Sequence, residues 1–484
     1  MNKKNLDNFK QPWVLAIDQG GHATRATVLS ADGYIISEGQ IPLAPLPGDR
    51  HIEYDPGQMI ASIRAAIDKV SKDIDVSRVK RAALATQRSN VLCWDRHTGA
   101  PLSPIISWQD RRGADWLRNT KSELADKIHN KTGLFLSAHY GASKLHWCRK
   151  HIAAVSDAAR SGRLAWGPMS SWLIRQLCQE APFVCDAVNA SRTLLWSIAD
   201  GNWSDELIHA FELDDGTLPE CVDNRYDFGT LEVRGHAIPL EIVTGDQAAA
   251  LYAHGQPDRD TAYVTIGTGA FILNPCGSTP AVTDDLLSTL VWYAQETPGF
   301  VHEGTINGAA SALEYFAGQL GQASYIEQMG QWLQQEPSPP LFLNGYAGLG
   351  TPYMHPDFES RFIGDSDVPG KLVAVIESIV FLLMINLQRM RDHNPAIKQI
   401  KVGGGLARFD GLCQRLADLG LPVVRHEQTE TTTLGLAWLL TQDTLTPDRR
   451  LPLTGTPFLP HDNPGLQQRF QRWRETLNEA LAND

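Results

Sequence analysis

The stretch VLAIDQGGHATRATV, residues 14–28, joins an apolar run, an acidic residue and two adjacent glycines. The apolar run predicts a buried strand that ends at Asp18, and the residues after Arg25 predict a second strand that returns beside it. Gly20 and Gly21 permit a sharp turn and leave backbone N–H groups accessible to an anion. The stretch therefore predicts a strand–turn–strand unit with a phosphate-sized opening at its tip.

Two interpretations of this unit stay open. The turn is either a tight hairpin without a ligand or one wall of a phosphate site. Asp18 is either a turn or capping residue or a partner for Mg²⁺, which carboxylates hold beside phosphates, often through water. Its position directly after four apolar residues favours magnesium.

The residues that follow predict a mixed α/β domain. An Asp-Gly turn precedes the strand-like residues 34–43, and residues 55–70 place apolar side chains at helical spacing behind Asp55, a capping residue. Further predictions are a strand at 79–87, a helix at 170–177, an extended segment at 188–196, and a strand, acidic turn and helix at 239–255.

The opening pattern recurs about half a chain later, in TAYVTIGTGAFILNPCG, residues 261–277. This weak internal repeat predicts two domains with related cores, residues 1–253 and 254–484, joined at the polar segment HGQPDRD. A third glycine-rich turn, Gly403-Gly404-Gly405, follows a predicted strand. Residues 429–442 predict a last core helix behind a threonine run suited to N-capping.

The composition of the chain argues against several classes of function and of site. The chain has 484 residues and a net charge of -12, which argues against a general nucleic-acid binder. Its seven cysteines form no Cys-x-x-Cys pair, so neither a zinc site nor a disulfide framework is indicated. The N-terminus lacks the apolar run of a signal peptide, and residues 373–387 predict a buried helix rather than a membrane span. We expect a cytoplasmic protein.

The glycine turns favour a nucleotide ligand. The first two turns, Gly20-Gly21 and Gly267–Gly269, would bind its phosphates from both sides. No P-loop motif and no Gly-x-Gly-x-x-Gly after a strand occurs, so the phosphates need a different cradle.

Polar and aromatic residues after the predicted strands suggest a second ligand. Asp246 is equally well explained as a helix N-cap and as a base that takes a proton from a hydroxyl. Arg88 and Trp108 suit a sugar or polyol pocket, or else surface ion pairs and a core tryptophan. His139 and Tyr140 are further candidates.

Several stretches together resemble the FGGY family of carbohydrate kinases, and within it the glycerol kinases. They occur in the family's order and cover roughly residues 12–440: VLAIDQG, IEYDP, TQRSN, SWQDRR, WLIRQL, NASRTLLW, GDQAAAL, GTGAFIL, GYAGLGTPY and GGG…TTTLGLAWL. The resemblance implies the two-domain actin-like ATPase (ribonuclease H-like) fold with a central cleft. It implies Mg²⁺-dependent transfer of phosphate from ATP to a hydroxyl of a small polyol or sugar.

The resemblance also implies roles for single residues. Asp246 matches the family's catalytic base and Asp18 its magnesium-associated aspartate. The residues implied for the substrate are Arg88, Ser89, Trp108, His139, Asp246, Gln247 and Phe271. The residues implied for ATP are Gly20, Gly21, His22, Arg25, Gly267, Thr268, Gly269, Gly404 and Gly405.

Three departures from the glycerol kinases concern the ligands. Gly21 and His22 stand in place of two threonines in the first phosphate loop. Ser89 stands where a glutamate follows the substrate arginine. The substrate tyrosine aligns with His139, whereas an alignment shifted by one residue would use Tyr140. These changes predict a roomier, less anionic pocket whose best substrate is a longer polyol or a ketose rather than glycerol.

The sequence leaves two other functions to consider. A kinase homologue with an impaired phosphate loop would act as a sugar or nucleotide sensor, but retention of Asp18 and Asp246 argues against it. A chaperone-type ATPase on the same fold is disfavoured by Arg88, Trp108 and Phe271. The expected partner is a small molecule, with no nucleic acid and no membrane. The resemblance also allows a homodimer or homotetramer.

Overall fold

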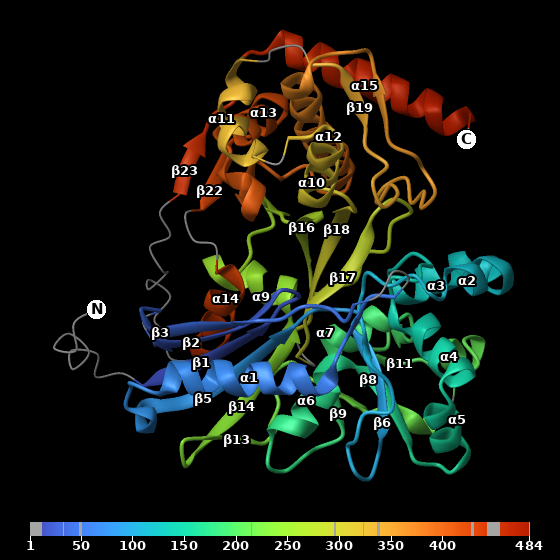
Figure 1. Cartoon of the computed structure of the whole chain (residues 1–484), viewed down its shortest axis with the longest axis vertical. Helices are drawn as coiled ribbons and strands as arrows, with labels where there is room; N and C mark the ends of the chain where they lie inside the picture. The colour runs from blue at the N-terminus through green and yellow to red at the C-terminus, as the bar shows by residue number, and fades with distance from the viewer. Residues whose placement is uncertain are drawn as a thin grey trace.

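The computed structural model describes residues 12–31, 33–47, 51–213, 215–294, 297–322, 324–335, 339–426, 430–442 and 455–483. Asp32 of the expected Asp-Gly turn lies outside these residues. Figure 1 shows two α/β halves, one above the other, each built around its own sheet.

The N-terminal half contains a six-stranded sheet. Its strand order is β13 (Thr230–Val233), β14 (His236–Gly245), β5 (Val79–Thr86), β1 (Trp13–Gln19), β2 (Ala23–Ser30) and β3 (Ile35–Pro42). β1, β2 and β3 pair antiparallel, whereas β1, β5 and β14 pair parallel. The predicted strand–turn–strand unit is therefore confirmed as β1 and β2.

The C-terminal sheet repeats this topology. Its order is β17 (Leu287–Trp292), β18 (Gly299–Ile306), β16 (Ala270–Gly277), β15 (Thr261–Ile266), β21 (Gln399–Gly403), β22 (Val423–His426) and β23 (Gly455–Phe458). β15, β16 and β18 pair antiparallel, and β15, β21 and β22 pair parallel. The strands β3-β2-β1-β5-β14 of the first sheet and the strands β18-β16-β15-β21-β22 of the second sheet have the same order and the same directions. The predicted internal repeat is therefore confirmed.

Smaller strands complete each half. A four-stranded sheet contains β4 (Glu53–Tyr54), β7 (Ile105–Ile106), β6 (Val91–Asp95) and β8 (Leu164–Pro168). Three strand pairs are β9 (Val184–Asp186) with β12 (Glu220–Val222), β10 (Trp196–Ser197) with β11 (Asn202–Trp203), and β19 (Leu341–Leu343) with β20 (Arg361–Ile363).

Helices cover both sheets. α1 (Pro56–Ser71) begins as predicted behind Asp55, whose side chain accepts a hydrogen bond from Gln58 N. The other helices are α2 (Ala114–Thr120), α3 (Ala125–Thr132), α4 (Gly141–His151), α5 (Ala153–Arg160), α6 (Met169–Leu177), α7 (Ala187–Ala190), α8 (Asp205–Ala210), α9 (Asp246–Leu251), α10 (Ala310–Gln319), α11 (Tyr325–Gln335), α12 (Val368–His393), α13 (Asp410–Leu419), α14 (Thr431–Thr441) and α15 (Pro464–Asn483).

The long helix α12 forms the core of the C-terminal half. It packs on β16, β18, α10, α11 and α13, and most of its side chains are buried. Its Glu377 accepts hydrogen bonds from Arg415 and Arg469, which reach it from α13 and α15. Among the described residues it is the one helix long and apolar enough to cross a membrane, and the expectation that it is a buried helix is confirmed.

One predicted extended segment is wrong. Residues 188–196 contain most of α7 and a following turn of 3₁₀ helix, Ser191–Thr193. Asp186 explains the difference, because its carboxylate accepts a hydrogen bond from Asn189 N at 3.0 Å and so caps a short helix. This turn of chain places Arg192 at the interface between the halves.

The parallel strands β1, β5 and β14 end at the same edge of the N-terminal sheet, and candidate site residues lie at these ends. Gln19 of β1 and Gly245 of β14 both pair with Thr86, the last residue of β5. Asp18, Arg88 and Asp246 therefore meet at one edge of the N-terminal sheet. In the other half, Thr265 pairs with Gly403, which brings the second and third glycine turns together.

α14 belongs to the C-terminal half by sequence but packs on α9, β1 and β5 of the N-terminal half (Figure 1). The contact is close at Gly435, where a Cβ atom would overlap the carbonyl oxygen of Ala249. The halves are thus joined by a helix pair that has no space for a methyl group. The predicted division at residues 253 and 254 stays a prediction.

We expect Gly435→Ala to destabilise the protein by about 1–3 kcal/mol, because overpacking outweighs the gain in helix propensity. Gly330→Ala on α11 is the matched control: its Cβ would meet no atom within 4 Å, so alanine should stabilise or leave stability unchanged. Urea unfolding of both variants measures the difference. An equal or higher midpoint for Gly435→Ala would contradict the close packing.

Candidate active site

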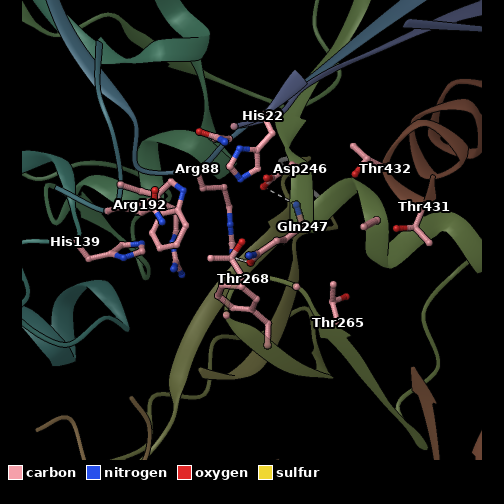
Figure 2. Close-up of a pocket in the computed structure, with 18 of the residues that line it drawn as sticks. His22, Arg88, His139, Arg192, Asp246, Gln247, Thr265, Thr268, Thr431 and Thr432 are labelled. Atoms are coloured by element: carbon pink, nitrogen blue, oxygen red, sulfur yellow. Dashed lines mark hydrogen bonds between the residues drawn. The ribbon is translucent and has the colours of Figure 1, made fainter. Parts of the chain in front are cut away.

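A cavity of about 330 Å³ lies between the two halves. Residues from both halves line it, as Figure 2 shows. Its lining residues are Gly21, His22, Tyr54, Gln87, Arg88, Trp108, Gln109, His139, Arg192, Asp246, Gln247, Ala250, Thr265, Gly267, Thr268, Gly269, Phe271, Thr431 and Thr432. A smaller cavity adjoins it, sharing Gln247, Ala250, Thr265, Phe271 and Thr431.

The structure brings most of the predicted site residues to these cavities. The main cavity contains eleven of them: Gly21, His22, Arg88, Trp108, His139, Asp246, Gln247, Gly267, Thr268, Gly269 and Phe271. Gly404 lines the adjoining cavity with Lys401 and His426. Asp18, Gly20, Arg25, Ser89 and Gly405 are not among the lining residues of either cavity.

Several lining residues were not predicted from the sequence. Arg192 lies in the NASRT stretch, which carried the family resemblance but no site assignment. Thr431 and Thr432 were expected to cap a helix, whereas they form the first turn of α14 and Glu430 occupies the cap position without a side-chain hydrogen bond. Gln87 and Tyr54 gave no local signal of a site.

The two glycine turns at the cavity differ in the space around them. A Cβ on Gly21 would overlap the amide nitrogen of Gln87, and the Tyr54 hydroxyl donates to the Gly21 carbonyl at 3.1 Å. Gly21 therefore leaves room for the Gln87 side chain of its own half and also lines the cavity. A Cβ on Gly267 would meet only Gly269 O, at 3.9 Å, so the second turn opens on free space. Gly404 has φ of 93° and its Cβ would overlap Ile266.

A buried ion cluster joins the halves beside the cavity. Glu303 on β18 is fully buried, and its carboxylate is bracketed by the guanidinium groups of Arg88 and Arg192, with N–O distances of 3.3–3.4 Å. The two arginines hold the pKa of Glu303 at about 2 despite its burial, which alone would raise it. Arg88 also donates to the side-chain oxygen of Gln247.

Asp246 is the first residue of α9, and Gly245 occupies the cap position. The interpretation of Asp246 as an N-cap is therefore wrong by one residue, because β14 runs directly into the helix. One carboxylate oxygen accepts from Gln247 N at 2.7 Å. Burial raises the pKa of Asp246, while the positive charge of Arg88 opposes that rise.

Asp18 lies buried beside Asp246. Burial, and next the negative charge of Asp246, raise its pKa to about 7. Oδ1 of Asp18 has no hydrogen-bond partner among the described residues, and Oδ2 lies 3.7 Å from Arg25, which itself pairs with Glu430 at 3.0 Å. A buried carboxylate with a free oxygen fits a divalent cation held mainly by phosphates and water, as Mg²⁺ is.

The far side of the cavity is aromatic and cationic. His139 lies 5.3 Å from Trp108 between ring centroids, and Arg192 lies over the ring of Tyr140 at 5.2 Å. Burial first, and then the charges of Arg111, Arg192, Lys144 and Arg88, hold the pKa of His139 well below its usual range. The imidazole is therefore neutral at pH 7.

Family models match nearly the whole described chain. The N-terminal domain of the FGGY family of carbohydrate kinases matches residues 13–252, and its C-terminal domain matches residues 262–441. The chain belongs to the FGGY family of carbohydrate kinases. Its enzymatic class is that of a phosphotransferase with an alcohol acceptor, for which ATP is the phosphoryl donor.

Individual relatives carry the name glycerol kinase. That of Alkalilimnicola ehrlichii is 34% identical over 442 residues, covering 88% of this chain and 89% of its own. That of Parabacteroides distasonis is 31% identical over 449 residues, covering 89% of both chains.

Solved structures show the same fold. Plasmodium falciparum glycerol kinase with ADP superimposes with a TM-score of 0.85 at 22% identity, covering 97% of this chain and 98% of that one. The ligand-bound xylulose kinase of Lactobacillus acidophilus gives 0.84 at 17% identity, covering 96% and 98%. These likenesses confirm the expected two-domain α/β fold of the FGGY kinase.

We expect Glu303→Gln to lower both stability and turnover of this FGGY kinase. The substitution removes the negative charge that two buried guanidinium groups share, which lowers the free energy of unfolding by on the order of 3 kcal/mol. Arg88 also loses the carboxylate that fixes it beside Asp246. Urea unfolding and steady-state kinetics check this, with the exposed Glu232→Gln as control. Wild-type kcat/KM in Glu303→Gln would show that the cluster does not position Arg88.

Asp18 gives a pH-dependent expectation for the metal-free, nucleotide-free enzyme. The pKa of Asp18 in the folded state is about 7, above the ordinary 3.8. The ionised carboxylate therefore lowers the stability of the folded state by its full amount above pH 7. This destabilisation shrinks as the pH falls toward 4. Asp18→Asn should therefore raise the unfolding midpoint at pH 8, by an amount that shrinks as the pH falls. An equal gain at pH 8 and pH 4.5, with exposed Asp392→Asn as control, would contradict this.

Proposed function

We propose that this enzyme transfers the γ-phosphoryl group of ATP to a hydroxyl of a polyol or sugar larger than glycerol, with Asp246 as the base. The supporting observation is the place of Asp246. Its carboxylate faces the cavity, whose lining also includes the open glycine turn Gly267–Gly269, Arg88 and Trp108 (Figure 2).

In this step Asp246 accepts the proton of the acceptor hydroxyl as its oxygen attacks the γ-phosphorus. The bond from that phosphorus to the bridging oxygen of ADP breaks. Phosphoryl transfer depends mainly on positioning and charge stabilisation. Gln247 N holds one oxygen of the Asp246 carboxylate, and Arg88 lies within reach of other hydroxyls because Glu303 and Gln247 fix its guanidinium.

The phosphates of ATP would lie along the glycine turns. Space around Gly267 and the backbone N–H groups of Thr268 and Gly269 suits an anion. The hydroxyls of Thr431 and Thr432 face the same cavity from α14. The family resemblance implies that the nucleoside would lie on the side of Gly404, which lines the smaller adjoining cavity.

Mg²⁺ would be held at Asp18, whose buried Oδ1 has no partner among the described residues. The cation supplies charge neutralisation at the phosphate oxygens. Arg25 and Glu430 connect Asp18 to the start of α14, so the carboxylate is held in place from both halves.

The pocket supports a substrate larger than glycerol. Where the glycerol kinases have a glutamate, Ser89 is buried and its hydroxyl has no hydrogen-bond partner among the described residues. It lines neither cavity and leaves no carboxylate to bind a small triol. His139, in place of a tyrosine, lines the cavity while Tyr140 packs against Arg192 behind it.

The test is ADP release with MgATP over glycerol, the four- and five-carbon alditols and ketoses, and dihydroxyacetone. We expect turnover of at least one longer compound above that of glycerol. Asp246→Asn should lower kcat roughly 10²- to 10⁴-fold, the usual contribution of a general base, and exposed Asp392→Asn should not.

Two results would contradict the proposal. Glycerol turned over as well as every longer compound would remove the substrate preference. Binding of ATP without turnover of any compound would favour a sensor. Self-association as a dimer or tetramer rests on the resemblance, and light scattering of the purified protein tests it. The cytoplasmic location rests on the seven scattered cysteines, which indicate reduced thiols.

A further inference from the structure

Gln87 lines the cavity, but the mechanism described so far gives it no role. It follows directly on β5, and its side chain is buried. A Cβ atom on Gly21 would overlap Nε2 of Gln87 and would lie 3.3 Å from the Tyr54 hydroxyl. The terminal amide of Gln87 therefore occupies the space into which a side chain at position 21 would project.

Hydrogen bonds determine which end of this amide faces Gly21. The backbone N–H of Trp108 can only donate, and it donates to Oδ1 of Asn90 at 2.8 Å. The other end of the Asn90 amide, Nδ2, then donates to Oε1 of Gln87 at 2.8 Å. Because the oxygen of Gln87 faces Asn90, its Nε2 faces Gly21 and carries two N–H donors there.

Tyr54 accepts one of these two donors. Its hydroxyl donates to the Gly21 carbonyl oxygen at 3.1 Å and accepts a hydrogen bond from the Gln87 side chain. Burial raises the pKa of Tyr54, and the hydrogen bond from Gln87 opposes that rise. Over the described ranges the second N–H of Nε2 has no acceptor, so it is available to a ligand in the cavity.

The position of this donor indicates which phosphate of ATP it would meet. Gly21 follows β1 and Gln87 follows β5, and Gln87 N donates to the Gln19 carbonyl oxygen at 3.2 Å. Both residues therefore lie at the sheet edge that carries Asp18 and Asp246. The γ-phosphate is the part of ATP that must approach the hydroxyl beside Asp246, so it is the phosphate nearest this edge.

We propose, building on the kinase function above, that Nε2 of Gln87 donates a hydrogen bond to an oxygen of the phosphoryl group that is transferred. It thereby replaces the threonine side chain that the glycerol kinases have at the position of Gly21. Hydrogen bonds to a charged phosphate are strong, and phosphoryl transfer depends on such stabilisation. Gln87 gains and loses no proton in the step.

The first experiment measures by titration calorimetry the binding of MgADP and of magnesium β,γ-imido-ATP, which retains a third phosphate. Gln87→Glu keeps an oxygen for Asn90 but removes the donor, and Gln87→Ala removes the whole amide. We expect either change to lower the ratio of β,γ-imido-ATP affinity to ADP affinity roughly tenfold to a hundredfold, the contribution of a hydrogen bond to a charged group. Exposed Gln58→Ala on α1 is the matched control and should leave the ratio unchanged.

The second experiment returns the donor to position 21. In Gly21→Thr/Gln87→Ala the new side chain fills the space that the amide leaves, and its hydroxyl is a donor. The backbone of Gly21 permits a side chain because its φ is not positive. Gly21→Val/Gln87→Ala fills the same space without a donor. We expect the threonine variant to recover most of the affinity ratio and the valine variant to recover none, with urea unfolding to verify that both fold.

Three results would overturn the role of Gln87. The first is an unchanged affinity ratio in folded Gln87→Glu and Gln87→Ala. The second is an equal loss for both nucleotides, because the donor would then not meet the terminal phosphate. The third is equal recovery by threonine and valine, since filling the space would then explain it. Nucleotide binding without turnover of any acceptor would contradict the kinase function, and the affinity ratio would still decide whether Gln87 contacts the terminal phosphate.

Discussion

The interaction on which the site depends is the buried cluster of Arg88, Glu303 and Arg192. Glu303 comes from the sheet of one half, and the two arginines come from the other. An unpaired charge at this depth would be strongly unfavourable, so each half needs the other to complete the cluster. The same contacts fix Arg88 beside Gln247 and Asp246, so the joint between the halves also organises the pocket.

A second joint lies on the other side of Asp246. α14 crosses from the C-terminal sequence to pack on α9, and its glycine at 435 lets the two backbones approach. Its first turn brings Thr431 and Thr432 to the cavity. The carboxylate of Asp246 therefore lies between an ionic contact and a close helix contact, and both contacts join the halves around the cavity.

Burying carboxylates close together at the site lowers the stability of the folded protein. Asp18 is buried near Asp246, and its pKa of about 7 records the strain of holding a negative charge there without a cation. A divalent cation and the phosphates it accompanies would relieve that strain.

The sequence by itself determined the repeated strand–glycine turn–strand units, a buried helix at 373–387, and Asp18 and Asp246 as candidate site residues. These depend on local spacing, which reports strands, turns and helices directly. It did not determine that residues 188–196 turn into a helix, because a single capping bond from Asp186 decided that.

Only the tertiary structure revealed Glu303, Arg192 and the threonines of α14 as parts of one site. Each lies far along the chain from Arg88 and Asp246, and nothing in its neighbours indicates a ligand. Gly21, expected to serve phosphate, also leaves room for the Gln87 side chain, and nothing in the sequence indicated that contact. Such roles depend on which surfaces meet, and that is decided by packing and charge pairing between segments that are distant in sequence.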